Sequence, residues 1–212
     1  MFLPPVKLPR RMWAGGRLEL HQALRVDDPV ERKSEIASVS EKTGRNGQLV
    51  FVTVRHRLYG SAGLAIEEQQ DIVYREASAG SAASQSPLHG KADWEREVRP
   101  SEALLFRYSA LIFNAHRIHY DHRYCAQVEG YPGLVVHGPL IATYLLELTR
   151  ARMPQARISA FSYRGVSPLF DSAPFRVCGQ PSADGRSAEL WAESPERMLA
   201  MSARAEFAPA GA

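Results

Sequence analysis

Histidines cluster in one stretch of the sequence, Phe106–Leu140, which contains four of the seven histidines of the chain. The stretch reads FRYSALIFNAHRIHYDHRYCAQVEGYPGLVVHGPL. A neutral imidazole can both accept and donate a proton near pH 7, so histidine is well suited to general acid–base catalysis. The two cysteines, Cys125 and Cys178, form no CxxC pair and no Cys/His ligand spacing, so a zinc site is not indicated. The stretch therefore predicts a proton-transfer site, and nothing in the sequence argues for a metal or a redox cofactor.

His119 is the strongest candidate for the acid–base residue, because it ends the run NAHRIH, which also contains Asn114 and His116. The amide of Asn114 could orient a water molecule, although an amide cannot accept the proton of that water, and an ordinary turn residue is the alternative. For His116, a role in the site and a hydrogen bond within its own turn are equally open. We expect His122 to be solvated and Asp121 to cap the helical turn that follows it.

The histidine-rich stretch leads into the strongest helix pattern of the chain, Gly138–Arg150. Pro139 suits the first helical position, and arginine at the end complements the helix dipole. Apolar residues occupy nearly the whole circumference, which predicts a buried helix. The N-terminus of a helix has free N–H donors, so Gly138 could bind a developing oxyanion, with His137 as a cap or a wall of the pocket.

The chain divides near its middle, where residues 78–93 are small, polar and interrupted by glycine and proline, as in a linker or a long loop. The first half contains strand patterns and no convincing helix, and the second half contains the buried helix followed by strands. The predicted strands are Arg17–Val26, Glu35–Glu41, residues 50–55, Leu64–Tyr74, Arg157–Val166, Pro174–Gln180, Ser187–Glu193 and Met198–Phe207, with a hairpin turn at Asn46-Gly47. A long antiparallel sheet wrapped around one central helix satisfies both halves, so we predict an α+β fold.

The composition is that of a globular protein, with 45% apolar and 23% charged residues in a chain of 212. The net charge of +3 arises from scattered basic residues, so a nucleic-acid-binding stripe is not predicted. No apolar run reaches the roughly 18 residues of a membrane span, and prolines at positions 4, 5 and 9 interrupt the run that a signal peptide needs. We therefore expect a cytoplasmic protein of a reducing compartment, without nucleic-acid or membrane partners.

The segments FNAHRIHYD and VEGYPGLVVHGPL resemble the MaoC-like hydratase/dehydratase family. The resemblance is to the branch of itaconyl-CoA and mesaconyl-C4-CoA hydratases and mitochondrial-type 3-hydroxyacyl thioester dehydratases, and PRRMWAGGRLE and FSYRGVSPLF also match it. In the general signature of the family an acidic residue stands where this chain has Asn114, although this branch commonly carries asparagine. The resemblance implies a double hotdog fold. Residues 1–93 would then form a partial N-terminal hotdog half with its linker, and residues 94–212 a C-terminal half with the catalytic motif.

The resemblance also implies a hydro-lyase that reversibly hydrates a short 2-enoyl-CoA, such as itaconyl-CoA or mesaconyl-CoA, to the 3-hydroxyacyl-CoA. Asn114, His119 and Gly138 are the expected catalytic residues. The expected substrate-binding residues are His116, Tyr120, His137, Arg107, Arg117 and Arg164, with the arginines meeting the CoA phosphates; Arg123 is a further candidate for that contact. Three alternatives remain open: a dehydratase acting on a carrier protein, an acyl-CoA thioesterase, and a non-catalytic subunit that binds acyl-CoA.

Members of this family begin with a segment that supplies the helix of the first hotdog. We therefore expect either a first half reduced to its sheet or a native start upstream of Met1. Apolar strands without a helix need another cover, and open sheet edges have to be paired or covered. A homodimer is expected for this reason.

Overall fold

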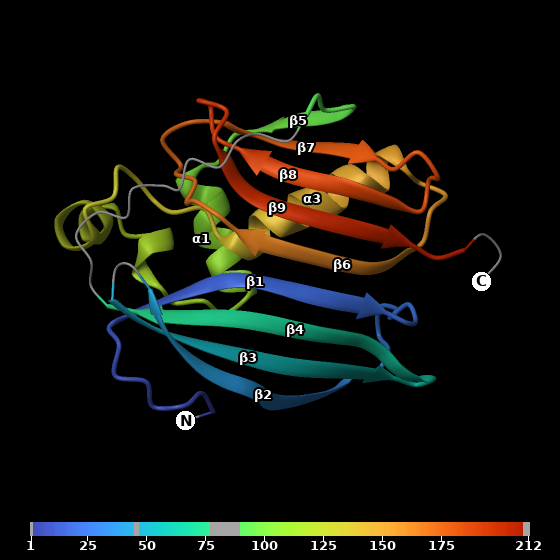
Figure 1. Cartoon of the computed structure of the whole chain (residues 1–212), viewed down its shortest axis with the longest axis horizontal. Helices are drawn as coiled ribbons and strands as arrows, with labels where there is room; N and C mark the ends of the chain where they lie inside the picture. The colour runs from blue at the N-terminus through green and yellow to red at the C-terminus, as the bar shows by residue number, and fades with distance from the viewer. Residues whose placement is uncertain (1, 45–46, 77–89, 210–212) are drawn as a thin grey trace.

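One antiparallel sheet dominates the computed structural model, which describes residues 2–44, 47–76 and 90–209. In these residues nine strands follow the order β2-β3-β4-β1-β6-β9-β8-β7-β5 (Figure 1). The first half of the chain provides β1 (Arg10–Leu20), β2 (Glu31–Gly44), β3 (Gly47–Gly60) and β4 (Gly63–Arg75). The second half provides β5 (Trp94–Val98), β6 (Ile158–Gly165), β7 (Phe175–Pro181), β8 (Ser187–Glu193) and β9 (Leu199–Phe207). The predicted α+β class and long antiparallel sheet are confirmed.

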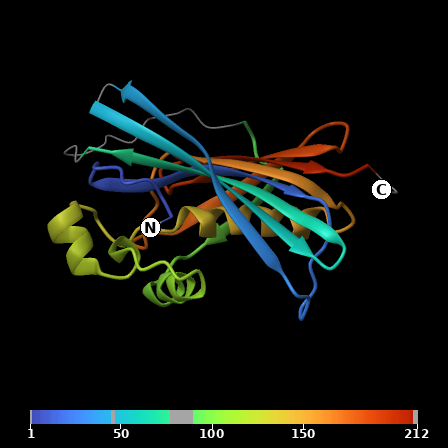
Figure 2. The same ribbon diagram turned by 90° about the horizontal axis from the view of Figure 1, so that it is seen from below.

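Helix α3 (Gly138–Arg152) lies along one face of the second half of the sheet (Figure 2). Its apolar side chains are buried in the main core against β7, β8 and β9; examples are Leu140, Ile141, Leu145 and Leu148 of α3 and Phe175, Val177, Leu190 and Ala203 of the sheet. An antiparallel sheet can bury one face on such a helix and leave the other to solvent. The prediction of a buried central helix is confirmed, and its N-terminus is thereby held rigidly.

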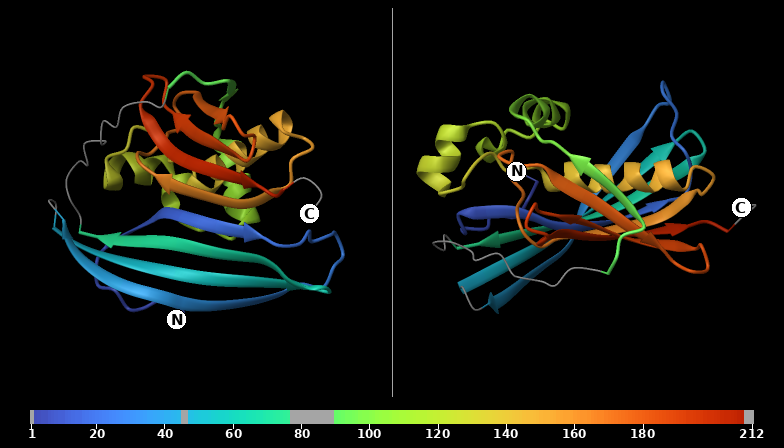
Figure 3. Two further views of the ribbon diagram at one scale, coloured as in Figure 1. Left: turned by 45° about the vertical axis from the view of Figure 1, so that its right-hand side comes forward. Right: turned by 90° about the horizontal axis from the view of Figure 1, so that it is seen from above.

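The first half has no helix within residues 2–44 and 47–76, as expected from its sequence (Figure 3). Its small core consists of Val50, Val52, Val54 and Tyr74. The extended N-terminal segment packs against this core through Leu3, Val6 and Leu8. This segment therefore covers part of the face on which the second half carries its helix.

The two halves join where β1 pairs with β6, next to a register shift between Trp13 and Gly15. A Cβ atom on Gly15 would lie 2.5 Å from the backbone oxygen of Tyr163, and one on Gly16 would lie 2.7 Å from its hydroxyl. The two glycines therefore permit a backbone approach that a side chain would prevent. This junction makes the sheet continuous across the middle of the chain.

In the first half the structure differs from the sequence prediction at one strand and agrees with it at one hairpin. The strand predicted at Arg17–Val26 is wrong in its bounds, because β1 begins at Arg10 and ends at Leu20. The register shift and the paired glycines break the alternation of apolar and polar residues on which the prediction relied. The hairpin between β2 and β3 is confirmed by their pairing up to Gly44 and Gly47, although residues 45–46 of its turn lie outside the described part.

The predicted linker at residues 78–93 falls mostly on residues 77–89, which lie outside the described part of the chain. The second half contains one helix that the sequence did not predict, α1 (Glu102–Leu111). Ser101 caps it by accepting a hydrogen bond from the backbone N–H of Leu104 at 3.2 Å. Within the described ranges, no helix is long and apolar enough to span a membrane.

Candidate active site

The histidine-rich stretch forms short helical turns between α1 and α3. These are η1 (Arg117–His119), α2 (His122–Tyr124) and the π-helical turn η2 (Cys125–Glu129). Asp121 accepts a hydrogen bond from the backbone N–H of Tyr124 at 2.9 Å, so it caps α2 as predicted. Asp121 also pairs with Arg117 at 2.7 Å. These local contacts fold the stretch into a compact overhang beside the start of α3.

The ring of His119 is buried and fixed by a backbone carbonyl. Its Nδ1 lies 2.7 Å from the oxygen of Val135. A carbonyl oxygen can only accept, so Nδ1 carries the proton of the neutral ring. The other nitrogen, Nε2, therefore presents a lone pair. This is the state in which a histidine can take a proton from a water molecule.

His137 stacks against His119, with ring centroids 3.7 Å apart and planes inclined by 15°. His137 is fully buried, and its Nε2 is hydrogen-bonded to Ser109 Oγ at 2.9 Å. Tyr108 contacts the same ring edge-on at 4.9 Å between centroids. His137 occupies the N-cap position of α3, but its side chain makes no capping hydrogen bond. His137 is thus the N-cap residue of α3 through its backbone, as expected, while its ring packs against His119 and forms a wall of the candidate site.

Burial keeps both stacked rings neutral at pH 7. Desolvation lowers the pKa of His119 to about 4, an effect that the hydrogen bond to Val135 opposes and the neighbouring His116 reinforces. Desolvation also lowers the pKa of His137 to about 3, with a further lowering by the other two histidines. Each ring disfavours a positive charge on the next. The site therefore offers an uncharged base rather than an imidazolium acid in its resting state.

Asn114 and His116 belong to the same turn as His119. Asn114 Oδ1 accepts a hydrogen bond from the backbone N–H of His116 at 3.0 Å. The backbone N–H of His119 in turn donates to the carbonyl of His116 at 3.2 Å, and the two imidazole rings meet edge to face at 5.8 Å. The oxygen of Asn114 thus shapes the turn, which leaves its NH₂ group available to a ligand.

Gly138 begins α3 next to His137, at the positive end of the helix dipole. The first N–H groups of a helix have no partner within the helix. A Cβ atom placed on Gly138 would meet only the Cε of Met201, at 3.9 Å. No side chain therefore crowds the Cα of Gly138, and the absence of its own side chain leaves room beside this N–H for a small acceptor such as a thioester oxygen.

The remaining expected substrate-binding residues are spread over the surface. Tyr120 donates its hydroxyl to the carbonyl of Ala115 at 2.9 Å, which closes the overhang. Arg117 stacks on Tyr124 with 4.4 Å between its Cζ and the ring centroid. Arg107 is exposed on α1, Arg123 pairs with Gln127, and Arg164 lies on β6 among exposed residues that alternate with the buried Phe161 and Tyr163. The structure therefore brings His116, His119, His137 and Gly138 together, but not the arginines.

Three supporting groups of the candidate site cannot be recognised from the sequence pattern. Ser109 and Tyr108 reach His137 only because residues 102–111 form a helix, which the sequence pattern did not reveal. The Val135 carbonyl belongs to the backbone, so no residue type could have indicated it. The exposed apolar residues of α1, Phe106 and Leu111, hid the amphipathic pattern that normally marks a helix.

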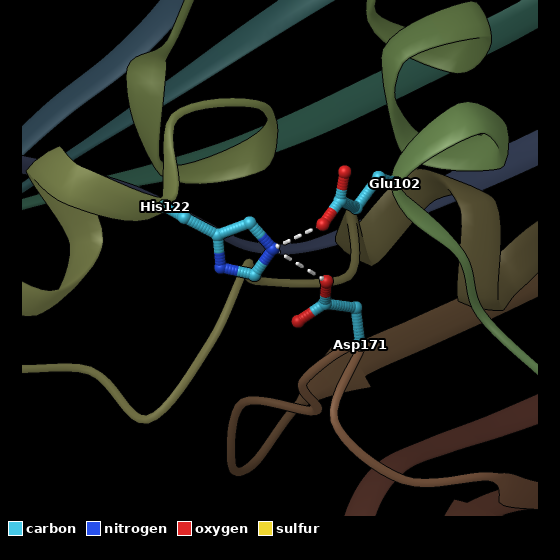
Figure 4. Close-up of side chains that lie close together, drawn as sticks. All are labelled: Glu102, His122 and Asp171. Carbon is cyan, nitrogen blue, oxygen red and sulfur yellow. Dashed lines mark ion pairs between the residues drawn. The ribbon is translucent and has the colours of Figure 1, made fainter.

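One group of side chains in the described part of the chain could supply ligands to a metal ion: Glu102, His122 and Asp171 (Figure 4). His122 Nε2 lies 2.9 Å from Glu102 Oε1 and 3.2 Å from Asp171 Oδ2. These are hydrogen-bond distances, so an ion-pair cluster accounts for the geometry. The ring of His122 is exposed to solvent, as expected, and it is also held by two carboxylates from distant parts of the chain, which the sequence did not indicate.

Comparison with protein families matches residues 1–171 to the family described as hydroxyacyl-thioester dehydratase type 2. Mesaconyl-C(4)-CoA hydratase of Chloroflexus aurantiacus is 47% identical over 210 residues, which cover 97% of this chain and 73% of that protein. The mitochondrial hydroxyacyl-thioester dehydratase type 2 of Schizosaccharomyces pombe is 31% identical over 199 residues, which cover 82% of this chain and 66% of that protein. The chain thus spans 66% to 73% of the length of these two relatives.

Solved structures agree on the fold. The MaoC-like dehydratase of Phytophthora capsici superposes with a TM-score of 0.71 at 16% identity, covering 98% of this chain and 76% of that one. The peroxisomal multifunctional enzyme type 2 of Drosophila melanogaster gives a TM-score of 0.75 at 16% identity, covering 93% of this chain and 37% of that one. The family match and the closely similar hydratase lead to one conclusion: the chain belongs to the hydroxyacyl-thioester dehydratase type 2 family, with the MaoC-like hotdog fold.

Proposed function

We propose that this protein is a hydro-lyase that reversibly hydrates a 2-enoyl-CoA thioester to the 3-hydroxyacyl-CoA. The observation that carries the proposal is the 2.7 Å contact between His119 Nδ1 and the carbonyl oxygen of Val135, which places the proton of the neutral ring on Nδ1 and leaves the Nε2 lone pair for a reacting water. This base stacks on His137, the N-cap residue of α3, which directly precedes Gly138. A base and an oxyanion donor at one site are the two groups that hydration of an enoyl thioester requires.

In the proposed mechanism, His119 Nε2 takes a proton from a water molecule as the water oxygen bonds to C3 of the enoyl group. The π electrons of the double bond move toward the thioester, and the backbone N–H of Gly138 stabilises the oxygen of the resulting enolate. The protonated His119 then returns its proton to C2, which regenerates the carbonyl. Asn114 orients the water through its amide and takes no proton, since an amide is neither acid nor base at pH 7.

The proposed substrate is a short, branched dicarboxylic acyl-CoA such as mesaconyl-C4-CoA or itaconyl-CoA. The 47% identity to mesaconyl-C(4)-CoA hydratase over nearly the whole chain supports this class. His116, Tyr120 and His137 would line the acyl site, and Arg107, Arg117 and Arg164 would meet the phosphates of CoA. Arginine suits that contact because its planar guanidinium binds phosphate oxygens in pairs.

A second candidate is dehydration of a 3-hydroxyacyl group on a carrier protein. The 31% identity to a mitochondrial hydroxyacyl-thioester dehydratase supports it. The reacting atoms and the site residues would be the same, with His119 acting in the reverse direction. The two candidates differ only in what carries the thioester.

A panel of enoyl thioesters tests the proposal and separates the alternatives. The purified protein would be mixed with mesaconyl-C4-CoA, itaconyl-CoA, crotonyl-CoA and crotonyl carrier protein, while enoyl absorbance and free thiol are followed together. We expect absorbance to fall without release of thiol, fastest with a dicarboxylic CoA ester. Thiol release would instead identify a thioesterase, an activity found in the acyl-ACP thioesterase of Bacteroides thetaiotaomicron, which has the same fold at a TM-score of 0.59 and 8% identity. Binding without either change would identify a non-catalytic subunit.

We further propose that the protein works as a homodimer in the cytoplasm. The buried, unpaired thiols of Cys125 and Cys178 are compatible with a reducing compartment. Cell fractionation with an antibody against the chain would test the location. Recovery of the protein from an organelle or membrane fraction would contradict it.

A further inference from the structure

The cluster of Glu102, His122 and Asp171 lies outside the mechanism proposed above (Figure 4). We propose that it is a positioning cluster: by holding residues 134–136 it fixes the Val135 carbonyl and so selects the tautomer of His119. The inference rests on the proposed role of His119 and extends it to side chains that touch no reacting atom.

Asp171 makes two hydrogen bonds with the backbone of Leu134. Its backbone N–H donates to the carbonyl of Leu134 at 2.9 Å, and its Oδ1 accepts from the backbone N–H of Leu134 at 2.8 Å. A Cβ atom on Gly133 would lie 2.5 Å from the same Oδ1. The absence of a side chain at Gly133 therefore lets the carboxylate reach the backbone of the segment that carries Val135.

Val135 links the position of this segment to the ring of His119. Its backbone N–H donates to the carbonyl of Ile118 at 2.8 Å, while its carbonyl accepts from His119 Nδ1 at 2.7 Å. Val136 is held in the same way, since its N–H donates to the carbonyl of Leu169 at 2.8 Å. A shift of residues 134–136 would move the carbonyl oxygen of Val135 away from His119 Nδ1. The ring would then lose the hydrogen bond that favours the Nδ1–H tautomer.

His122 keeps the carboxylate of Asp171 in place. The side chain of Asp171 is only 8% exposed, and a buried carboxylate is costly unless a counter-charge and hydrogen bonds compensate it. His122 Nε2–H provides that partner at 3.2 Å and also bonds Glu102 at 2.9 Å. Glu102 begins α1, which carries the Ser109 that holds His137. The cluster thus ties α1, whose Ser109 holds His137, to Asp171, which holds the segment that carries the Val135 carbonyl.

The test compares Asp171→Ala with Asp171→Asn. For Asp171→Ala we expect kcat to fall about 10- to 100-fold with KM little changed, because a small displacement of a catalytic group costs that much. Nitrogen NMR of the His119 ring should show the Nδ1–H tautomer in the wild type and a mixture of tautomers in Asp171→Ala. The amide oxygen of Asp171→Asn can still accept from Leu134, so this variant should keep most of the kcat and the wild-type ring signals.

Glu193→Ala is the matched control. Glu193 is another buried carboxylate, 2% exposed and paired with Arg176, but it lies at the end of β8. This variant should lose stability while kcat and the His119 signals stay unchanged.

If Asp171→Ala behaves like Glu193→Ala, the cluster is only structural and the proposal is overturned. If Asp171→Ala does not fold, His122→Gln at the half-exposed partner is measured in the same way, and unchanged tautomer signals would overturn the proposal.

Chelation separates positioning from metal binding. Treating the wild-type protein with EDTA should leave kcat and the ring signals unchanged. A loss of activity that Zn²⁺ or Mn²⁺ restores would overturn the proposal in favour of a metal site. The NMR measurement does not depend on turnover, so a failure to hydrate any enoyl thioester would refute the proposed function while the positioning claim is still decided.

Discussion

The chemistry of His119 is set by its surroundings rather than by its residue type alone. The spacing of Asn114, His116 and His119 predicts that the three residues share one turn, and the structure places them there because their contacts are local. The proton on Nδ1 could not be predicted, because its acceptor at Val135 comes from a segment that packs against the turn only in the folded protein. The same holds for Ser109, which reaches His137 from α1.

The depressed pKa of His119 gives an expected pH dependence. Only the neutral ring can take a proton from water, and burial lowers its pKa to about 4. The value of kcat/KM should therefore stay level as the pH falls through 6.5 and decline only near pH 4. A pH–rate profile measures this directly. A decline centred near 6.5 would show that the working base is a solvated histidine.

Stability has to be followed in the same experiment. His119 and His137 bind protons more readily in the unfolded chain, because burial lowers their pKa in the fold. The unfolded state then carries more protons below pH 6.5, so the free energy of unfolding falls as the pH falls from there toward 4. Denaturant titrations at each pH would show which part of any lost activity reflects unfolding.

The variant Gly138→Val tests whether the backbone N–H of Gly138 is the oxyanion donor. Its backbone does not adopt the left-handed conformation that would demand glycine, and the space at its Cα is open. A valine side chain should therefore be compatible with the fold yet block the approach of the thioester oxygen. Loss of one such donor typically raises the barrier by roughly 2.7–4 kcal/mol, so turnover of Gly138→Val should collapse while the melting temperature stays close to wild type. Full activity, or unfolding of the variant, would remove support from this assignment.

At the scale of elements, α3 is the central support of the site. Leu145 is fully buried between this helix and the sheet, whereas the adjacent Leu146 is only partly buried. Leu145→Ala should lower the free energy of unfolding by about 2–5 kcal/mol through the cavity that it leaves. The matched variant Leu146→Ala should cost clearly less in the same denaturant titration. Equal losses would mean that the helix is not packed as described.

The elements differ in how far their sequence predicts them. The strands β8 and β9 and helix α3 were predicted closely, because their apolar patterns match the faces that they bury. Helix α1 was missed because Phe106 and Leu111 are exposed, and β5 was missed because it is a short edge strand. Register shifts, such as the one between Trp13 and Gly15, depend on contacts with neighbouring strands and leave no periodic pattern.

At the scale of the whole molecule, the first half, which has no helix within residues 2–44 and 47–76, supports the half that contains the candidate site. It continues the sheet through β1 and β6, and Arg10 of β1 pairs with Glu129 of the overhang at 3.4 Å. Glu129 also accepts a hydrogen bond from Tyr124 at 3.1 Å. The first half therefore contacts the overhang that contains His119, although it contributes none of the expected catalytic residues.

The first half also leads us to expect a homodimer. Strand β2 forms one edge of the sheet over Glu31–Gly44, and Ile36 and Val39 on it are exposed. A long open edge presents unpaired N–H and C=O groups that another chain can pair with or cover. Light scattering at micromolar concentration should give twice the mass of the chain. A monodisperse monomer would contradict this expectation.

The central claim is that His119 adds water to the double bond of an enoyl-CoA, and one isotope measurement tests it most directly. Mesaconyl-C4-CoA would be incubated with the wild type and with His119→Ala in water labelled with heavy oxygen, and the products analysed by mass spectrometry. We expect the wild type to place the label on the C3 hydroxyl of an intact thioester. The folded His119→Ala variant should do so at least about 10²-fold more slowly, the loss typical of a missing acid–base group. Label in a released carboxylate, or an unchanged rate in His119→Ala, would contradict the account.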